Sequence, residues 1–159
     1  MPVSVVDYTV LPHSLIEQHA YSPRFEQHQQ IAPTTLVISD DQDLRMLLVG
    51  CLQTLTYPAI GASHGEQALA FLAQYPIRRV ILDFPLSSRV PTTTCAEIRQ
   101  QAYDTEILVL SASTEQTIRQ QTPGRGADWY LQKPFRLADL QSALQSLQAR
   151  GQRVKLPKN

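Results

Sequence analysis

The chain has 159 residues, of which 14 are lysine or arginine, 14 are aspartate or glutamate and 43% are hydrophobic. This length is typical of one main domain with an appendage. The balanced charge argues against a protein that attracts nucleic acid or a membrane surface through a strong electrostatic field. No apolar run approaches the roughly 18 residues of a membrane span.

The N-terminal residues and the two cysteines indicate the cellular compartment of the protein. No basic start followed by an apolar stretch opens the chain, so the sequence predicts no secretory signal. Cys51 and Cys95 fall in separate helical patterns without metal-type spacing, which favours a reducing environment. We therefore expect a cytoplasmic protein without a membrane partner.

Residues 1–33 differ from the rest of the chain, because they hold four prolines and three of the four histidines. We predict a partly irregular extension with at most one short helix near Ser14–Ala20, where Ser14 and Glu17 match a capping box. The gaps between His13, His19 and His28 fit no compact metal-ligand pattern.

From residue 34 to about residue 148, strand and helix patterns alternate five times. A strand from Thr34 runs into Asp40 and Asp41, and the helix after it places six residues on one face: Leu44, Leu47, Leu48, Cys51, Leu52 and Leu55. A short strand over residues 57–62 and a helix over residues 65–74 follow. The helix is expected to bury Ala68, Leu69, Phe71 and Leu72.

The second half of the chain continues the alternation. A strand over residues 80–82 leads to Asp83, and a helix runs from Pro91 to Arg99. A strand over residues 107–110 precedes a polar helix over 115–121, and the fifth strand covers residues 128–132. The last helix covers residues 137–148 and repeats Leu137, Leu140, Leu144 and Leu147 for the core, with a dimer face as the second interpretation. Residues 151–159 form a short basic tail. The domain therefore covers residues 34–150.

This alternation predicts an α/β fold with a parallel sheet covered by helices on both faces. Ligands of such sheets lie beyond the carboxyl ends of the strands. Asp40, Asp83, Ser111 and Lys133 each follow or end a predicted strand, so we expect them to lie together at one edge of the sheet.

Five segments in this order resemble the receiver domain of two-component response regulators. They are residues 36–45 (LVISDDQDLR), 65–69 (GEQAL), 80–83 (VILD), 110–112 (LSA) and 126–135 (GADWYLQKPF). The resemblance implies a flavodoxin-like doubly wound (βα)5 sandwich with strand order 2-1-3-4-5. It also implies a signalling protein of the phosphorelay type rather than an enzyme.

The resemblance also implies roles for single residues. Asp83 is the expected phosphoacceptor, which becomes a 4-aspartylphosphate. Asp40, Asp83 and the carbonyl of Pro85 are the expected Mg²⁺ ligands, in keeping with the preference of this ion for oxygen donors. Lys133 is expected to pair with the phosphoryl oxygens and Ser111 to donate a hydroxyl hydrogen bond to one of them.

Ser111 and Tyr130 are the expected switch residues. In the family, the hydroxyl residue moves toward the phosphoryl group and the aromatic residue turns inward. Two alternatives stay open at this stage: Tyr130 as a core residue, and Asp40 as a simple helix N-cap.

The sequence departs from the family pattern in three places. Ser39 stands where the first residue of the acidic pair is expected, which predicts weaker Mg²⁺ binding, and Asp41 is expected to open the following helix instead. The loop after Asp83 is altered, with Ser87 and Pro91 in place of the usual proline and glycine. Residues 122–126 predict a short or mobile element.

The leading hypothesis is a stand-alone response regulator that receives a phosphoryl group from a sensor histidine kinase or phosphotransfer protein. It then changes its affinity for a downstream protein, and both a monomer and a dimer stay open. The alternative is a pseudo-receiver that binds partners independently of phosphorylation. A hydrolase is disfavoured because Phe84 and Pro85, not an acid, follow Asp83. Direct nucleic-acid binding is disfavoured because the tail is too short for a DNA-reading helix pair.

Overall fold

The computed structural model describes residues 32–84, 91–121 and 126–153. Its five strands are β1 (Thr35–Ile38), β2 (Ala59–Ala62), β3 (Arg79–Phe84), β4 (Glu106–Ser111) and β5 (Trp129–Gln132). They form one sheet in the order β2-β1-β3-β4-β5, and every neighbouring pair is parallel, which confirms the predicted topology. The C-terminal end of β3 therefore lies between β1 and β4.

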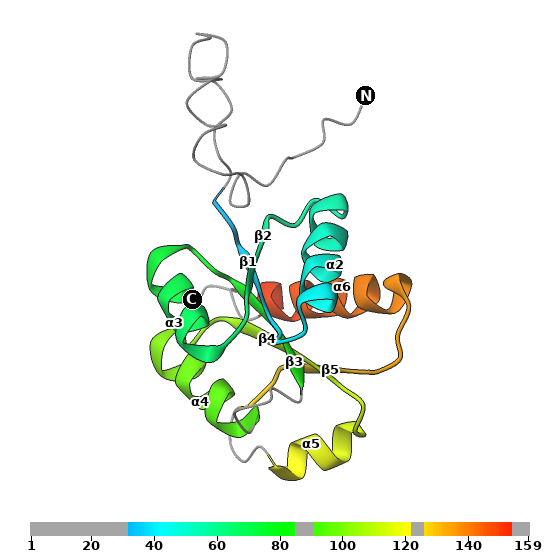
Figure 1. Cartoon of the computed structure of the whole chain (residues 1–159). Helices are drawn as coiled ribbons and strands as arrows, with labels where there is room; N and C mark the ends of the chain where they lie inside the picture. The colour runs from blue at the N-terminus through cyan, green and yellow to red at the C-terminus, as the bar shows by residue number, and fades with distance from the viewer. Residues whose placement is uncertain (1–31, 85–90, 122–125, 154–159) are drawn as a thin grey trace, which may run out of the picture. The chain divides into compact units, whose positions relative to one another are not determined.

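The described helices are α2 (Gln42–Thr54), α3 (Gly65–Gln74), α4 (Pro91–Gln101), α5 (Glu115–Gln121) and α6 (Leu137–Arg153). Figure 1 shows α2 and α6 on one side of the sheet and α3 and α4 on the other. The bounds of α3 and α5 are the predicted ones. Helix α6 continues past its predicted end at Gln148 to Arg153, so the first residues of the expected tail belong to the helix. The helix predicted near Ser14–Ala20 lies outside the described residues.

Strand alternation divides the core into two layers. Val80 and Leu82 of β3 pack with residues of α3 and α4, whereas Ile81 between them packs with residues of α2 and α6. All three side chains are fully buried. Because both faces are covered, the central strands are apolar along their length, as is typical of parallel sheets.

Two leucines predicted for the core are exposed. Leu47 of α2 is 62% exposed and Leu137, the first residue of α6, is 47% exposed. At about 100° per residue, Leu47 lies about 100° around the helix from Leu48 and about 140° from Leu52, the two residues of α2 that are buried against the sheet. The rest of the α6 repeat is buried as predicted: Leu140, Leu144 and Leu147.

A buried arginine joins α4 to the start of β4 and β5. Arg99 is 8% exposed and forms an ion pair with Asp128 at 2.6 Å between Nη2 and Oδ2. Its guanidinium also donates to the carbonyl oxygens of Thr105 and Gly126. Asp128 Oδ2 accepts in turn from the backbone N–H of Ile107 at 2.8 Å. The members of this network are far apart in the chain, so no local residue pattern indicates it.

Both cysteines are free. Cys95 is 1% exposed, and burial raises the pKa of its thiol to about 11, against the opposing effect of the positive charge on Arg99. Cys51 is half-buried on α2. None of the described helices is both long and apolar enough to cross a membrane.

The buried and the exposed face of α2 give a direct test of the packing. We expect Leu52→Ala, at a fully buried position, to lower the free energy of unfolding by about 2–5 kcal/mol, because it leaves a cavity against the sheet. Leu47→Ala in the same helix is the matched control and is expected to change it by less than about 0.5 kcal/mol. Urea denaturation followed by circular dichroism measures both values. Equal losses would contradict the assignment of Leu47 to the surface.

Candidate functional site

Asp83 lies near the end of the central strand and is only 3% exposed. It pairs in register with Leu110 of β4, and the next residue, Phe84, pairs with Ser111. The predicted strand ends at Leu82, before Asp83. In the structure β3 continues through Asp83 to Phe84. This position holds a carboxylate inside the sheet edge, where it needs protein partners for its charge.

Lys133 supplies the first partner. Its Nζ forms an ion pair with Oδ1 of Asp83 and also lies 3.4 Å from the carbonyl oxygen of Phe84. The backbone N–H of Lys133 donates to the carbonyl oxygen of Ser111 at 2.8 Å, which continues the ladder between β4 and β5. The peptide bond between Lys133 and Pro134 is cis. The predicted proximity of Lys133 and Asp83 is thus present.

Ser39 supplies the second partner, which the sequence analysis missed. It is fully buried at the end of β1, and its hydroxyl donates to Oδ2 of Asp83 at 2.7 Å. From the sequence alone, Ser39 is only the loss of an acid. The register of β1 and β3, which pairs Ile38 with Leu82, explains why Ser39 and Asp83 meet. Strand register was the missing information.

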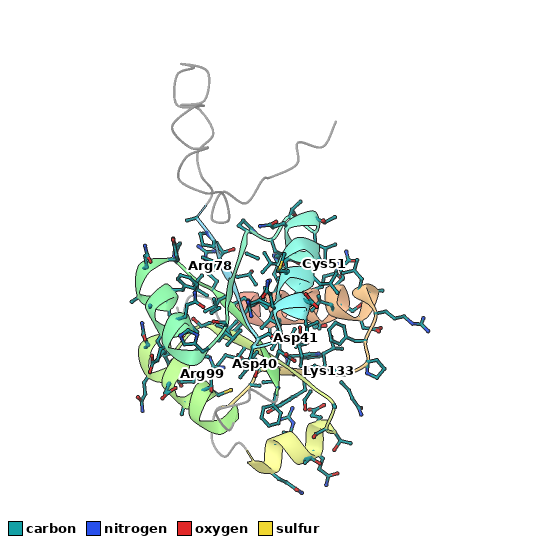
Figure 2. All side chains as sticks on the ribbon, in the orientation of Figure 1. Asp40, Asp41, Cys51, Arg78, Arg99 and Lys133 are labelled. Carbon is teal, nitrogen blue, oxygen red and sulfur yellow. The ribbon has the colours of Figure 1, made fainter. Side chains whose placement is uncertain are left out.

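The two acids after Ser39 have different roles. Asp41 is the N-cap of α2, because its Oδ1 accepts from the backbone N–H of Leu44 at 3.0 Å. This contact confirms that Asp41 opens the helix, and it shows that Asp40 is not the N-cap. Asp40 is exposed at the same end of the sheet as Lys133, as Figure 2 shows.

The oxygen donors at this edge suit a hard cation. Asp40 and Asp83 offer carboxylates, and Mg²⁺ is commonly held by one or two carboxylates together with waters. Both oxygens of Asp83 already accept from Lys133 or Ser39, so a cation there would share or replace one of these contacts. Pro85, the third expected ligand, lies in the altered loop outside the described residues. The described residues contain no cluster of three or more His, Cys, Asp or Glu side chains suited to a metal.

Ser111 and Tyr130 lie on the other face of the sheet. By strand alternation Ser111 shares its face with Val109 and Tyr130, whereas Asp83 shares its face with Ile81. Ser111 Oγ accepts from the backbone N–H of Ser113 at 3.0 Å. Ser111 and Tyr130 line one cavity of about 120 Å³. The structure thus places the two expected switch residues around one cavity, on the face of the sheet opposite Asp83.

Arg119 of α5 covers the ring of Tyr130. Its guanidinium carbon lies 5.0 Å from the ring centroid, within the range of a cation–π contact. The same guanidinium pairs with Glu115 at 2.6 Å. Burial raises the pKa of the Tyr130 hydroxyl above its ordinary value of 10.0, and the charge on Arg119 opposes this rise. No residue pattern in the sequence indicates this contact.

The family model for the response regulator receiver domain matches residues 35–145. The transcriptional regulatory protein BaeR of Escherichia coli O6:H1 is 33% identical over 103 residues, which cover 65% of this chain and 42% of BaeR. Response regulator RppA of Synechocystis is 31% identical over 119 residues, which cover 72% of this chain and 50% of RppA. The chain spans about half the length of these curated relatives.

Solved structures give the same result. Chemotaxis protein CheY4 of Vibrio cholerae matches with a TM-score of 0.68 at 25% identity, covering 74% of this chain and 99% of CheY4. Response regulator protein TrrA of Thermotoga maritima, solved in complex with Mg(2+)-BeF, matches with a TM-score of 0.63 at 29% identity. This match covers 71% of this chain and 96% of TrrA.

The contact between Arg119 and Tyr130 predicts a pKa change. We expect Arg119→Met to raise the pKa of Tyr130 further, because it removes the positive charge that stabilises the phenolate. NMR of tyrosine labelled with ¹³C at Cζ follows each tyrosine ring through a pH titration and so measures the pKa of Tyr130 beside those of the other tyrosines. Arg136→Met, at an exposed arginine before α6, is the control and should leave the titration unchanged. A lower pKa in Arg119→Met would contradict the contact.

Proposed function

The chain belongs to the response regulator receiver domain family, and we propose that it accepts a phosphoryl group on Asp83 from a phosphohistidine of a sensor histidine kinase or phosphotransfer protein. The observation that carries the proposal is the buried Asp83 carboxylate, paired with the ammonium of Lys133. A buried carboxylate facing an approaching phosphoryl group needs nearby positive charge, since like charges repel. Lys133 supplies that charge on the side of Oδ1.

The proposed chemistry is a transfer between two carriers. A carboxylate oxygen of Asp83 attacks the phosphorus atom, a P–O bond forms and the P–N bond to the donor imidazole breaks. The imidazole leaves with the electron pair and takes up a proton. Lys133 holds the transferred oxygens as a point charge, and positioning with charge neutralisation is most of what such a transfer requires.

Receiver domains of this family typically bind Mg²⁺, and the relative TrrA was solved in complex with Mg(2+)-BeF. In this chain we assign the ion to Asp40, Asp83 and the carbonyl of Pro85. When bound there, Mg²⁺ neutralises negative charge at the carboxylate and the incoming phosphoryl group. Ser39 weakens this site, because it provides a neutral hydroxyl where the family pattern has an acid.

The proposed change of partner affinity after phosphorylation begins at the cavity that Ser111 and Tyr130 line. A phosphoryl group on Asp83 attracts the hydroxyl of Ser111, and Tyr130 moves into the space that it leaves. The surface of α5, β5 and α6 changes with them, and with it the affinity for a downstream protein. A few kcal/mol of differential interaction are enough for such a shift. Control of transcription belongs to the longer relatives that carry that name and is not part of this proposal.

A second candidate function is a pseudo-receiver that binds its partner without phosphorylation. The observation that favours it is the hydrogen bond from Ser39 to Asp83, which already holds one carboxylate oxygen in the described pocket. In this case the pocket is a structural element only, and partner affinity does not respond to a phosphodonor or to Mg²⁺.

Phosphorylation is tested with a small acyl phosphate donor and Mg²⁺. We expect intact-mass spectrometry to detect one acid-labile phosphoryl group on the wild type and none on Asp83→Ala, which lacks the nucleophile. Asp104→Ala, at an exposed carboxylate near the opposite end of the sheet, is the matched control and should be labelled like the wild type. Equal labelling of Asp83→Ala would refute the assignment of the acceptor.

Binding of Mg²⁺ separates the two candidate functions. We expect saturable amide shifts in NMR at Asp40, Asp83 and Lys133 on titration with Mg²⁺, and smaller shifts in Asp40→Asn, which loses one carboxylate charge. Trp129 serves as an internal control, because it lies at the start of β5 and packs against α6, away from the pocket. Saturable shifts at these three residues would argue against the pseudo-receiver.

A further inference from the structure

We infer that Ser39 is a positioning residue that holds Oδ2 of Asp83 and leaves Oδ1, at Lys133, as the oxygen that attacks phosphorus. The inference rests on the proposed function and goes beyond it in one respect. Ser39 does not only weaken the metal site; it substitutes a hydrogen bond for part of the neutralisation that a metal supplies. Phosphorylation of this chain therefore depends less on Mg²⁺ than it would with an acid at position 39.

The hydrogen bonds of Ser39 define where its hydroxyl points. Its backbone N–H donates to the carbonyl oxygen of Ala62 at 3.0 Å, and its Oγ accepts from the backbone N–H of Asp41 at 3.2 Å. The single hydroxyl proton has two acceptors in reach, Asp83 Oδ2 at 2.7 Å and the carbonyl oxygen of Asp41 at 3.4 Å. The shorter, charge-assisted bond to Asp83 is the stronger one.

Arg45 holds the backbone of Ser39. Its Nη1 donates to the carbonyl oxygen of Ser39 at 2.6 Å. The stem of Arg45 reaches this carbonyl by crossing Gly61 of β2, where an added Cβ would lie 2.9 Å from Arg45 Cγ. Ser39 is thus held through its N–H, its carbonyl and its hydroxyl, and it is fully buried. A side chain held in this way can orient a neighbouring carboxylate.

The two oxygens of Asp83 consequently differ. Oδ2 accepts from Ser39, while Oδ1 faces the ammonium of Lys133. When Oδ1 forms the new bond to phosphorus and the P–N bond of the donor breaks, Oδ2 becomes the carbonyl oxygen of the acyl phosphate and keeps its hydrogen bond to Ser39. The ammonium of Lys133 can then pass to the phosphoryl oxygens. A carboxylate at position 39 has no proton to donate and would need a cation between itself and Asp83.

The experiment measures labelling by a small acyl phosphate donor in EDTA and across a series of Mg²⁺ concentrations. The wild type is expected to be labelled in EDTA. Ser39→Ala removes the donor and is expected to be labelled about tenfold more slowly there. Ser39→Thr keeps a hydroxyl and should restore most of the rate. Ser142→Ala, at an exposed serine of α6 that bonds only within its helix, is the matched control and should behave as wild type.

Ser39→Asp is expected to increase the dependence of labelling on Mg²⁺, and its Mg²⁺ affinity is a second measurement. It should require Mg²⁺ for labelling, and NMR titration should show Mg²⁺ binding about tenfold tighter than in the wild type, because a second buried acid is added. Wild type that is labelled only with Mg²⁺, or Ser39→Ala that matches the wild type in EDTA, overturns the inference and leaves the proposed function standing. Wild type and Ser39→Asp that both stay unlabelled with Mg²⁺ overturn the proposed function itself.

Discussion

A buried carboxylate at the end of the central strand is the constraint on which the pocket depends. Asp83 is 3% exposed, so bulk water cannot solvate its charge and the fold must supply partners. Lys133 and Ser39 each supply one donor, from opposite sides of β3. Loss of either donor would leave a buried charge short of a partner, which costs more than a surface hydrogen bond contributes.

The sheet brings these partners together because its parallel strands all end at one edge. Ser39 follows β1 and Lys133 follows β5, and Asp83 lies near the end of β3 between them. Ser111 ends β4 but belongs to the other face of the sheet, where it shares a cavity with Tyr130. Asp83 and the two expected switch residues therefore lie on opposite faces of the sheet.

Much of the fold could be predicted from residue patterns alone. Apolar runs identified the five strands, and the bounds of α3 and α5 agree with the structure. The error at Leu47 has a geometric origin, since Leu47 follows the apolar periodicity of α2 but lies about 100° around the helix from the buried Leu48. Asp83 and Lys133 were identified correctly as neighbours, because both follow from the rule that strand ends meet.

The sequence by itself determined the fold class, the strand order through its family resemblance, and the positions of the carboxylate and the amine at one edge. Only the tertiary structure decided what Ser39 does. Its hydroxyl meets Asp83 from 44 positions away in the chain, in a register that pairs Ile38 with Leu82. The contacts of Arg45 with Ser39 and of Arg119 with Tyr130 arose in the same way. Local patterns record which face a residue takes, but the partner across that face depends on packing between separate elements.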